Sequence, residues 1–311
     1  MSGVETVAVA ADLHNVATIG LDLGGTKLAA GLVRNGKVLR RLETPTPLHL
    51  GPLLDTIESM VSDLQGSEQL AIGLGVPGPV VNGETTFFSN LQGLNDSKIE
   101  QVLAQRLGRP VAFENDANLA ALAESRYGSA RGTQHSVYLT WSTGIGCGLI
   151  LNGEIFSGRT GMAGEVGHTR MGFSGTMDGS GTLGTLEAQA CGAALARDAS
   201  FVYGQPTSVP AIFEKMAGGD ERATDLIRNA AAYLGRFLHN LQLLLDPEVV
   251  VLGGGLMTQA SLLLPMIETE RRRTRALHDF TPLRLSHLGP DAGIVGAAEF
   301  ACQGDHQVRG R

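Results

Sequence analysis

The sequence predicts an α/β protein with two similar domains and a cleft between them. Two observations predict it: a glycine-turned hairpin that occurs twice, and a length of 311 residues, which exceeds the usual size of one domain. In the first copy, residues 18–41, an apolar run carries Asp22 to its end, glycines turn the chain, and a second run reaches Asn35-Gly36. Asn-Gly favours positive φ, so we expect two strands joined by a glycine turn and followed by a tight hairpin.

The second copy lies at residues 138–156. When the Asn-Gly pairs of the two copies are aligned, Thr143 falls at the position of Thr26. A repeat on this scale predicts two α/β halves, each opening with such a hairpin. Glycines lack Cβ atoms and let an oxygen-rich ligand such as phosphate approach the backbone. Two such turns in register are typical of a nucleotide clamp.

The composition excludes several classes of partner. The net charge of −7 argues against nucleic acid, since phosphate backbones bind basic patches. The sequence has no run of roughly 18 apolar residues that would cross a membrane, and residues 1–17 lack the basic start of a secretion signal, which predicts a flexible tail. Cys147, Cys191 and Cys302 stand far apart among small or apolar neighbours, as core thiols do in a reducing cytoplasm. We therefore expect a cytoplasmic protein.

The first half alternates helices and strands. Apolar spacing predicts a helix over residues 52–65, a buried strand over 70–76, a helix over 99–107 and a strand over 110–113. Gly75 lies at the carboxyl end of the strand over 70–76, where ligands of α/β folds bind, although the Pro-Gly-Pro that follows also fits a simple turn. Asn115 and Asp116 stand between the strand over 110–113 and a helix that runs to Glu124. Residue type alone favours a helix cap for Asp116 over a functional carboxylate.

The second half carries its polar residues in glycine-rich loops. Glu165 and His168 are three positions apart in the loop 158–168, which fits the binding of sugar hydroxyls better than a lone histidine would. Gly254 and Gly255 follow an apolar strand and offer bare backbone to a flat ring or a phosphate. The remaining predicted segments are a long helix over 221–245, the strand over 249–252, a helix over 262–276, a strand over 283–288 and a closing helix from 292.

The boundary between the two domains is expected near Gly132. This divides the chain into an N-terminal α/β domain at 18–132 and a C-terminal α/β domain at 133–311. The closing helix, about 292–303, could also pack back onto the first domain.

The order and spacing of several motifs resemble the ROK family, named for repressors, open reading frames and sugar kinases. The resemblance covers residues 18–301 and implies a two-domain actin-like, ribonuclease H-like ATPase fold with an interdomain cleft. The motifs that carry it, besides the two hairpins, are GLGVPGPV at 73–80, FENDANLAALAE at 113–124, GMAGEVGH at 161–168, VVVLGGGL at 249–256 and DAGIVGAA at 291–298.

Membership would imply transfer of the γ-phosphoryl group of ATP to a sugar hydroxyl. The resemblance then assigns Asp116 as the general base, which reverses the choice that residue type alone favours. It implies that Asp22 holds Mg²⁺ directly or through water. The expected sugar-binding residues are Gly75, Asn90, Asn115, Asp116, Glu165, His168 and Glu187. The expected nucleotide-binding residues are Asp22, Gly24, Gly25, Thr26, Lys27, Thr143, Gly144, Gly254 and Gly255.

One run departs from the family pattern. Family members typically carry C-x-C-G-x-x-G-C-x-E here, and its thiolates join the preceding histidine in a structural zinc site. In this chain Asp178, Ser180 and Thr185 stand where the three cysteines would, while Glu187 is retained. Serine and threonine do not replace thiolates, so we expect no structural zinc and expect His168 to serve the sugar alone.

The substrate is less sharply defined than the reaction. The retained Asn-Asp, Glu-x-x-His and Glu set matches the family's glucokinases, so glucose phosphorylated at its 6-hydroxyl is the first expectation. Kinases for fructose, mannose, N-acetylglucosamine and N-acetylmannosamine share the set. Some relatives without the cysteines use polyphosphate, but the acidic chain favours ATP. The resemblance also favours a homodimer or homotetramer.

Two readings from other classes compete with a kinase. Family repressors carry a helix-turn-helix domain before the first hairpin, and only 17 residues precede Thr18 here, too few for one. A non-catalytic, sugar-sensing protein would need neither Asp22 nor Asp116.

Overall fold

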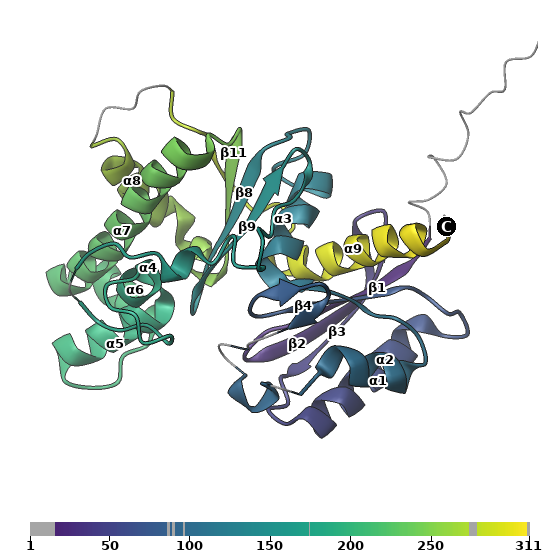
Figure 1. Ribbon diagram of the computed structural model, residues 1–311. Helices are drawn as coiled ribbons and strands as arrows, with labels where there is room; N and C mark the ends of the chain where they lie inside the picture. The colour runs from purple at the N-terminus through teal and green to yellow at the C-terminus, as the bar shows by residue number, and fades with distance from the viewer. Residues whose placement is uncertain are drawn as a thin grey trace, which may run out of the picture. The chain divides into compact units, whose positions relative to one another are not determined.

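The computed structural model describes residues 16–85, 88, 91–95, 97–173, 175–273 and 279–309 (Figure 1). The chain forms two compact units, one that runs to Tyr127 and takes in Asp291–Arg311, and one formed by Gly128–Pro290. The boundary predicted near Gly132 thus falls a few residues inside the second unit. The closing helix belongs to the first unit. The sequence left this open as an alternative to a second domain that spans 133–311.

The first unit is built on a five-stranded sheet. Its order is β3-β2-β1-β4-β7, in which β1, β4 and β7 are parallel while β2 runs antiparallel to β1 and to β3. The strands are β1 (Thr18–Leu23), β2 (Lys27–Arg34), β3 (Lys37–Pro45), β4 (Ile72–Val76) and β7 (Ala112–Asn115). The other elements of this unit are the pair β5 (Val80–Val81) and β6 (Glu84–Thr85), η2 (Gln92–Leu94), α1 (Leu50–Gln65), α2 (Ile99–Leu107), α3 (Asp116–Tyr127) and α9 (Ala292–Arg309).

Helices cover both faces of this sheet (Figure 1). On one face, α1 buries an apolar stripe that includes Leu53, Ile57 and Leu64 against Ile19 and Leu74 of the sheet. On the other face, α9 packs on β1 and β4 and also contacts α3. The sequence spacing that predicted a helix over 52–65 is the stripe that α1 buries.

Glycines let α9 lie directly on the backbone of the sheet. A Cβ atom on Gly20 of β1 would lie 1.9 Å from the carbonyl oxygen of Ile294, and one on Gly73 of β4 would lie 1.9 Å from that of Ala297. These separations are far below any van der Waals contact. The last helix of the chain therefore completes the first unit through backbone contacts that no other residue type would permit.

The second unit repeats the sheet of the first. Its order is β10-β9-β8-β11-β12, with β8, β11 and β12 parallel and β9 antiparallel to β8. The strands are β8 (Ser136–Trp141), β9 (Ile145–Leu151), β10 (Glu154–Ile155), β11 (Val249–Gly253) and β12 (Leu283–Leu285). The helices are η3 (Val166–His168), α4 (Leu186–Ala190), α5 (Gly192–Tyr203), α6 (Val209–Ala217), α7 (Glu221–Leu245), η4 (Gly255–Gln259), α8 (Ala260–Arg271) and η5 (Gly289–Asp291), which ends on the first residue of the other unit.

The core of the second unit lies between its sheet and α7. Leu234, Leu238 and Leu241 of α7 are buried with Leu139 and Trp141 of β8. The indole Nε1 of Trp141 donates to the carbonyl of Ala190 at 2.7 Å, so its polar atom is satisfied inside the core.

Both hairpins predicted from the Asn-Gly pairs are confirmed. Asn35 and Gly36 have φ of 51° and 70°, and Asn152 and Gly153 have φ of 56° and 78°. The strands on either side of each pair are antiparallel neighbours. The repeat seen in the sequence is therefore a repeat of topology.

Candidate functional site

A row of residues crosses the carboxyl edge of the first unit's sheet. Asp22, the fifth residue of β1, is paired in register with Gly75 of β4, and Gly75 is paired with Glu114 of β7. These three strands are parallel, so their carboxyl ends meet at one edge of the sheet. Ligands of α/β folds bind at such edges.

Gly75 brings the start of α3 close to this row. A Cβ atom on Gly75 would lie 3.0 Å from Cδ1 of Leu119 and 3.5 Å from Cα of Asp116. A residue larger than glycine at position 75 would press on the side chain of Leu119 in α3. The register and this contact together place Asp116 and Asp22 at the same edge of one sheet, on either side of Gly75.

The helix cap that the sequence offered to Asp116 is made chiefly by Asn115. Its side-chain oxygen accepts from the backbone N–H of Ala117 at 3.0 Å and of Asn118 at 3.1 Å. Its Nδ2 donates to the carbonyl of Gly78 at 3.1 Å. Asp116 is half-buried and accepts from the Ala117 N–H at 2.7 Å through Oδ1. Since Asn115 caps the helix, capping does not by itself explain the carboxylate at position 116.

The carboxyl group of Asp22 is largely shielded from solvent. Burial raises its pKa to about 6, and the positive charge of Arg41 only partly offsets that effect. Arg41 itself is engaged elsewhere, with Glu43 at 2.7 Å and Asp291 at 3.0 Å. A Cβ atom on Gly293 would lie 2.6 Å from Oδ2 of Asp22, so the first turn of α9 covers the carboxylate. A partly exposed carboxylate at this edge of the sheet is a suitable oxygen ligand for Mg²⁺.

We expect Asp22→Asn to stabilise the metal-free protein at neutral pH. The folded-state pKa of Asp22, about 6, lies above the reference value of 3.8. Its contribution to stability is therefore fully present below the unfolded pKa and is lost as the pH rises through 6, a change of about 3 kcal/mol. Urea unfolding at pH 4 and pH 7 should show a smaller pH effect in the variant than in wild type. Asp63→Asn, an exposed carboxylate on α1, serves as the control, and a variant less stable than wild type at pH 7 would contradict the expectation.

The first glycine turn is held by a residue that the sequence did not single out. Thr46, which follows β3, donates through Oγ1 to the carbonyl of Gly24 at 2.7 Å, and its N–H donates to the carbonyl of Thr26 at 3.0 Å. The side chains of Thr26 and Lys27 are exposed. Lys27 forms an ion pair with Glu43 at 2.7 Å, so a phosphate would have to compete with this carboxylate for the ammonium group. No local pattern marks Thr46, because its role depends on the pairing of β2 with β3.

The second glycine turn is held in a similar way. The carbonyls of Ser142 and Thr143 accept from the N–H groups of Gly192 at 2.8 Å and Ala193 at 3.0 Å, both at the start of α5. The side chain of Thr143 is exposed, like that of Thr26 in the first copy. Each unit thus presents a threonine hydroxyl on a turn whose carbonyls are already bonded.

Glu187 lies beneath the second turn. Its Oε2 accepts from the N–H of Ile145 at 3.0 Å. A Cβ atom on Gly144 would lie 2.7 Å from the same oxygen, so Gly144 has to be glycine for this contact. The residue expected to bind sugar therefore also fixes the turn expected to bind phosphate.

The glycine run after β11 packs against the end of β8. Gly254 has a φ of 91°, and a Cβ atom on it would lie 2.5 Å from the carbonyl oxygen of Trp141. The Cβ position of Gly255 lies 3.7 Å from Oγ of Ser142. The glycine run therefore adjoins the second turn within the same unit, as one nucleotide site formed by both would require. Its contact with adenosine stays a prediction.

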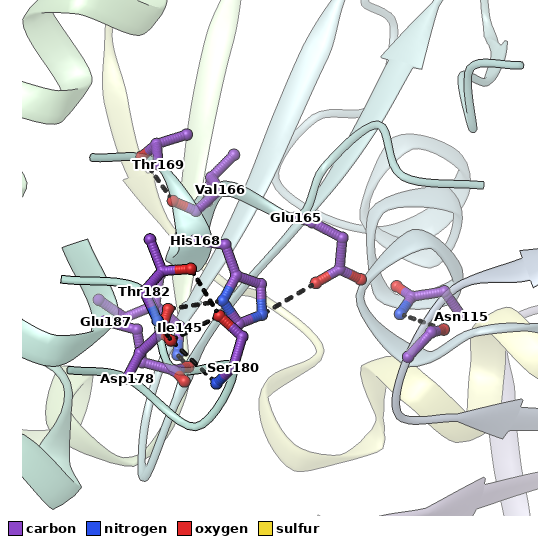
Figure 2. A network of polar contacts seen from close by, with 11 residues as sticks. Asn115, Ile145, Glu165, Val166, His168, Thr169, Asp178, Ser180, Thr182 and Glu187 are labelled. Atoms are coloured by element: carbon purple, nitrogen blue, oxygen red, sulfur yellow. Dashed lines mark hydrogen bonds and ion pairs between the residues drawn. The ribbon is translucent and has the colours of Figure 1, made fainter. Parts of the chain in front are cut away.

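The acid and the imidazole of the glycine-rich loop lie together (Figure 2). Nε2 of His168 is 3.9 Å from Oε2 of Glu165, and Nδ1 is 2.8 Å from Oδ2 of Asp178. Burial lowers the pKa of His168, but the carboxylates of Asp178, Glu187 and Glu165 outweigh burial and raise it. Burial, together with Glu187, raises the pKa of Glu165 against the opposing effect of His168.

The predicted site residues fall into two groups, one in each unit. Gly75, Asn115, Asp116, Asp22, Gly24, Gly25, Thr26 and Lys27 lie in the first unit, and Glu165, His168, Glu187, Thr143, Gly144, Gly254 and Gly255 lie in the second. Asn90 is outside the described residues. Within the part of the chain that the structure describes, His, Cys, Asp and Glu side chains form no group of three or more suited to a metal ion. None of the described helices has the length and hydropathy that a membrane crossing needs.

The matches to known proteins extend over nearly the whole length of this chain. The model of the ROK family matches residues 18–303. A glucokinase of Streptomyces coelicolor is 34% identical over 93% of this chain and 98% of its own. An N-acetylmannosamine kinase of Haemophilus influenzae is 29% identical over 90% of this chain and 93% of its own.

Solved structures agree with the sequence matches. The ROK hexokinase of Thermus thermophilus is 38% identical, with a TM-score of 0.82 over 94% of this chain and 100% of its own. A ROK family glucokinase of Streptomyces griseus, in complex with glucose and AMPPNP, is 31% identical, with a TM-score of 0.82 over 93% of this chain and 100% of its own.

Proposed function

The chain belongs to the ROK family and is an ATP-dependent sugar kinase; we propose that it transfers the γ-phosphoryl group of ATP to a hexose, with glucose as the first candidate. One observation carries the proposal: Asp22 and Asp116 lie at the same carboxyl edge of one sheet, on either side of Gly75. Phosphoryl transfer needs a metal ligand and a base for the accepting hydroxyl, and these two carboxylates can take those roles.

Asp116 is the proposed base. Asp116 is the first residue of α3 and is half-buried, and Asn115 makes the chief cap contacts of this helix. A carboxylate at this position can act as the general base that accepts the hydroxyl proton. Asp22 would hold Mg²⁺, and this ion would neutralise charge on the transferred phosphoryl group. The exposed hydroxyls of Thr26 and Thr143 would donate to phosphate oxygens from the two glycine turns.

The sugar-binding residues keep hydrogen-bonding capacity beyond their structural contacts. Asn115 uses one amide hydrogen on Gly78 and has a second one to donate. Glu187 uses Oε2 on Ile145 and has a second carboxylate oxygen. Glu165 and His168 are each about a quarter to a third exposed, with side-chain values of 26% and 32%. A polyol needs such a set of directional acceptors and donors.

Glucose is the first candidate because a glucokinase matches this chain at 34% identity and a solved ROK family glucokinase in complex with glucose matches it at 31%. An N-acetylmannosamine kinase of Escherichia fergusonii reaches 33%, so identity alone separates the two sugars little. N-acetylmannosamine is the second candidate, because that relative matches over nearly its whole length. The retained Glu165, His168 and Glu187 do not separate the two sugars.

A coupled assay of ADP release tests the proposal. With ATP and Mg²⁺ we expect turnover on glucose above that on fructose, mannose, N-acetylglucosamine and N-acetylmannosamine, and less product when polyphosphate replaces ATP. Phosphate on the 6-hydroxyl is checked by NMR of the product. Preference for N-acetylmannosamine would favour the second candidate, and no ADP release with any of the sugars would sink the proposal.

A further inference from the structure

Asp178 is a buried carboxylate at the centre of the loop that follows His168. The exposure of its side chain is 0%. Oδ1 accepts from the N–H of Ser180 at 2.9 Å, from Oγ of Ser180 at 2.6 Å and from the N–H of Thr182 at 3.0 Å. Oδ2 faces Nδ1 of His168 at 2.8 Å. One oxygen therefore folds the loop and the other reaches the imidazole (Figure 2).

Backbone bonds tie the two ends of this loop to each other. The N–H of Met171 donates to Gly184 at 2.8 Å, and the N–H of Leu186 donates to Thr169 at 2.9 Å. The N–H of Asp178 donates to the carbonyl of Thr182 at 3.0 Å. The carboxylate is consequently held on a hydrogen-bonded turn, and rotating it away from His168 would break the contacts to its Oδ1.

The hydrogen-bonding capacity of the Asp178 carboxylate decides which ring nitrogen of His168 carries the hydrogen. An ionised carboxylate only accepts hydrogen bonds, so Nδ1 of His168 has to donate to Oδ2. We propose that Asp178 is a positioning residue that holds His168 with its hydrogen on Nδ1 and its Nε2 toward Glu165. The inference deepens the proposed function and rests on it only for the role of Nε2.

This arrangement defines what the imidazole offers to a sugar. In neutral His168 with its hydrogen on Nδ1, Nε2 can only accept, so a sugar hydroxyl would donate a hydrogen bond to it. Glu165, 3.9 Å away, is a second acceptor. Two neighbouring acceptors fit two hydroxyls of one hexose, each of which can donate once and accept from elsewhere.

Asp178→Asn should move the hydrogen of neutral His168 from Nδ1 to Nε2, while the side chain at position 178 keeps nearly the same shape. The two N–H groups of Ser180 and Thr182 repel an amide NH₂, so the amide oxygen of the variant should take the place of Oδ1 and its NH₂ should face Nδ1. Nδ1 must then accept, and the hydrogen of neutral His168 moves to Nε2. We expect the hexose KM to rise on the order of tenfold, as the loss of one hydrogen bond predicts, with the KM for ATP unchanged.

The experiment reads the tautomer directly. Nitrogen-15 NMR of the whole protein, at a pH well above the raised pKa of His168, gives the two ring shifts of the neutral imidazole, assigned with His168→Gln. Wild type should carry its hydrogen on Nδ1, Asp178→Asn on Nε2, and Ser180→Ala, which removes one contact to Oδ1 and leaves the His168 contact, should match wild type in tautomer and in hexose KM.

Three results would overturn the inference: wild type with its hydrogen on Nε2, an Asp178→Asn variant with the wild-type tautomer, or equal rises in the KM for ATP and hexose, which would indicate a merely structural role. The wild-type spectrum decides even if the variant fails to fold. Wild-type protein that phosphorylates no hexose would refute the proposed function, while the tautomer measurement would still stand on its own.

Discussion

Asp116→Asn is expected to lower kcat by about 10²–10⁴-fold, the range that a general base contributes. The amide has nearly the shape of the carboxylate and can still accept from the N–H of Ala117, which Asp116 bonds at 2.7 Å. It cannot take a proton from a hydroxyl. The fold and the binding of hexose should therefore be retained, as measured by thermal unfolding and by calorimetric titration with glucose.

A matched control separates catalysis from helix capping. Asp220 is the cap of α7 in the second unit, and its Oδ1 accepts from the N–H of Arg222 at 2.9 Å. Asp220→Asn makes the same chemical change at another helix start, so we expect wild-type kcat from it. Turnover by Asp116→Asn at the wild-type rate would remove Asp116 as the base, and an equal fall in both variants would assign the effect to the helix ends.

Gly73→Ala should destabilise the protein by about 3 kcal/mol or more, at the upper end of the cost of overpacking a core. The new methyl group would lie 1.9 Å from the carbonyl oxygen of Ala297 and 2.6 Å from its carbon. Both are backbone atoms and cannot rotate away. Relief requires α9 to rise from β4, yet the helix is also in contact with Gly20 of β1. Denaturant unfolding followed by circular dichroism measures the loss.

The control for this variant is Gly51→Ala in α1. A Cβ atom at Gly51 meets nothing within 4 Å, and alanine is the better helix former by about 0.8–1.0 kcal/mol. We expect this variant to be as stable as wild type or more so. If Gly73→Ala proved equally harmless, α9 would not be seated on the backbone of β4 as the structure has it.

Local pattern predicted most of the elements. The two-domain actin-like ATPase fold is confirmed by the likeness to ROK kinase structures. The predicted helix at 99–107 has the bounds of α2, and the helix over 221–245 those of α7, because their apolar stripes are complete within the segment. Periodicity could not assign the closing helix to a unit. Its contacts with Gly20 and Gly73 join positions that are some 220 or more residues apart in the sequence.

The site was predicted as residue types at the ends of strands, and its pairings were not. Asp22 and Asp116 follow apolar runs, and that position is visible in a sequence. That Glu187 supports Gly144, that Lys27 is paired with Glu43 and that Asn115 caps α3 depends on side-chain contacts. A linear pattern does not encode which of two acceptors a donor reaches.

The place of α9 has a consequence for synthesis. The N-terminus of a chain leaves the ribosome first. The strands β1 and β4 therefore emerge long before α9, the helix that covers the face on which Gly20 and Gly73 lie. The second unit is continuous in the sequence and can fold while the ribosome is still attached. The unit whose synthesis begins first is therefore completed only after the whole second unit has been synthesised.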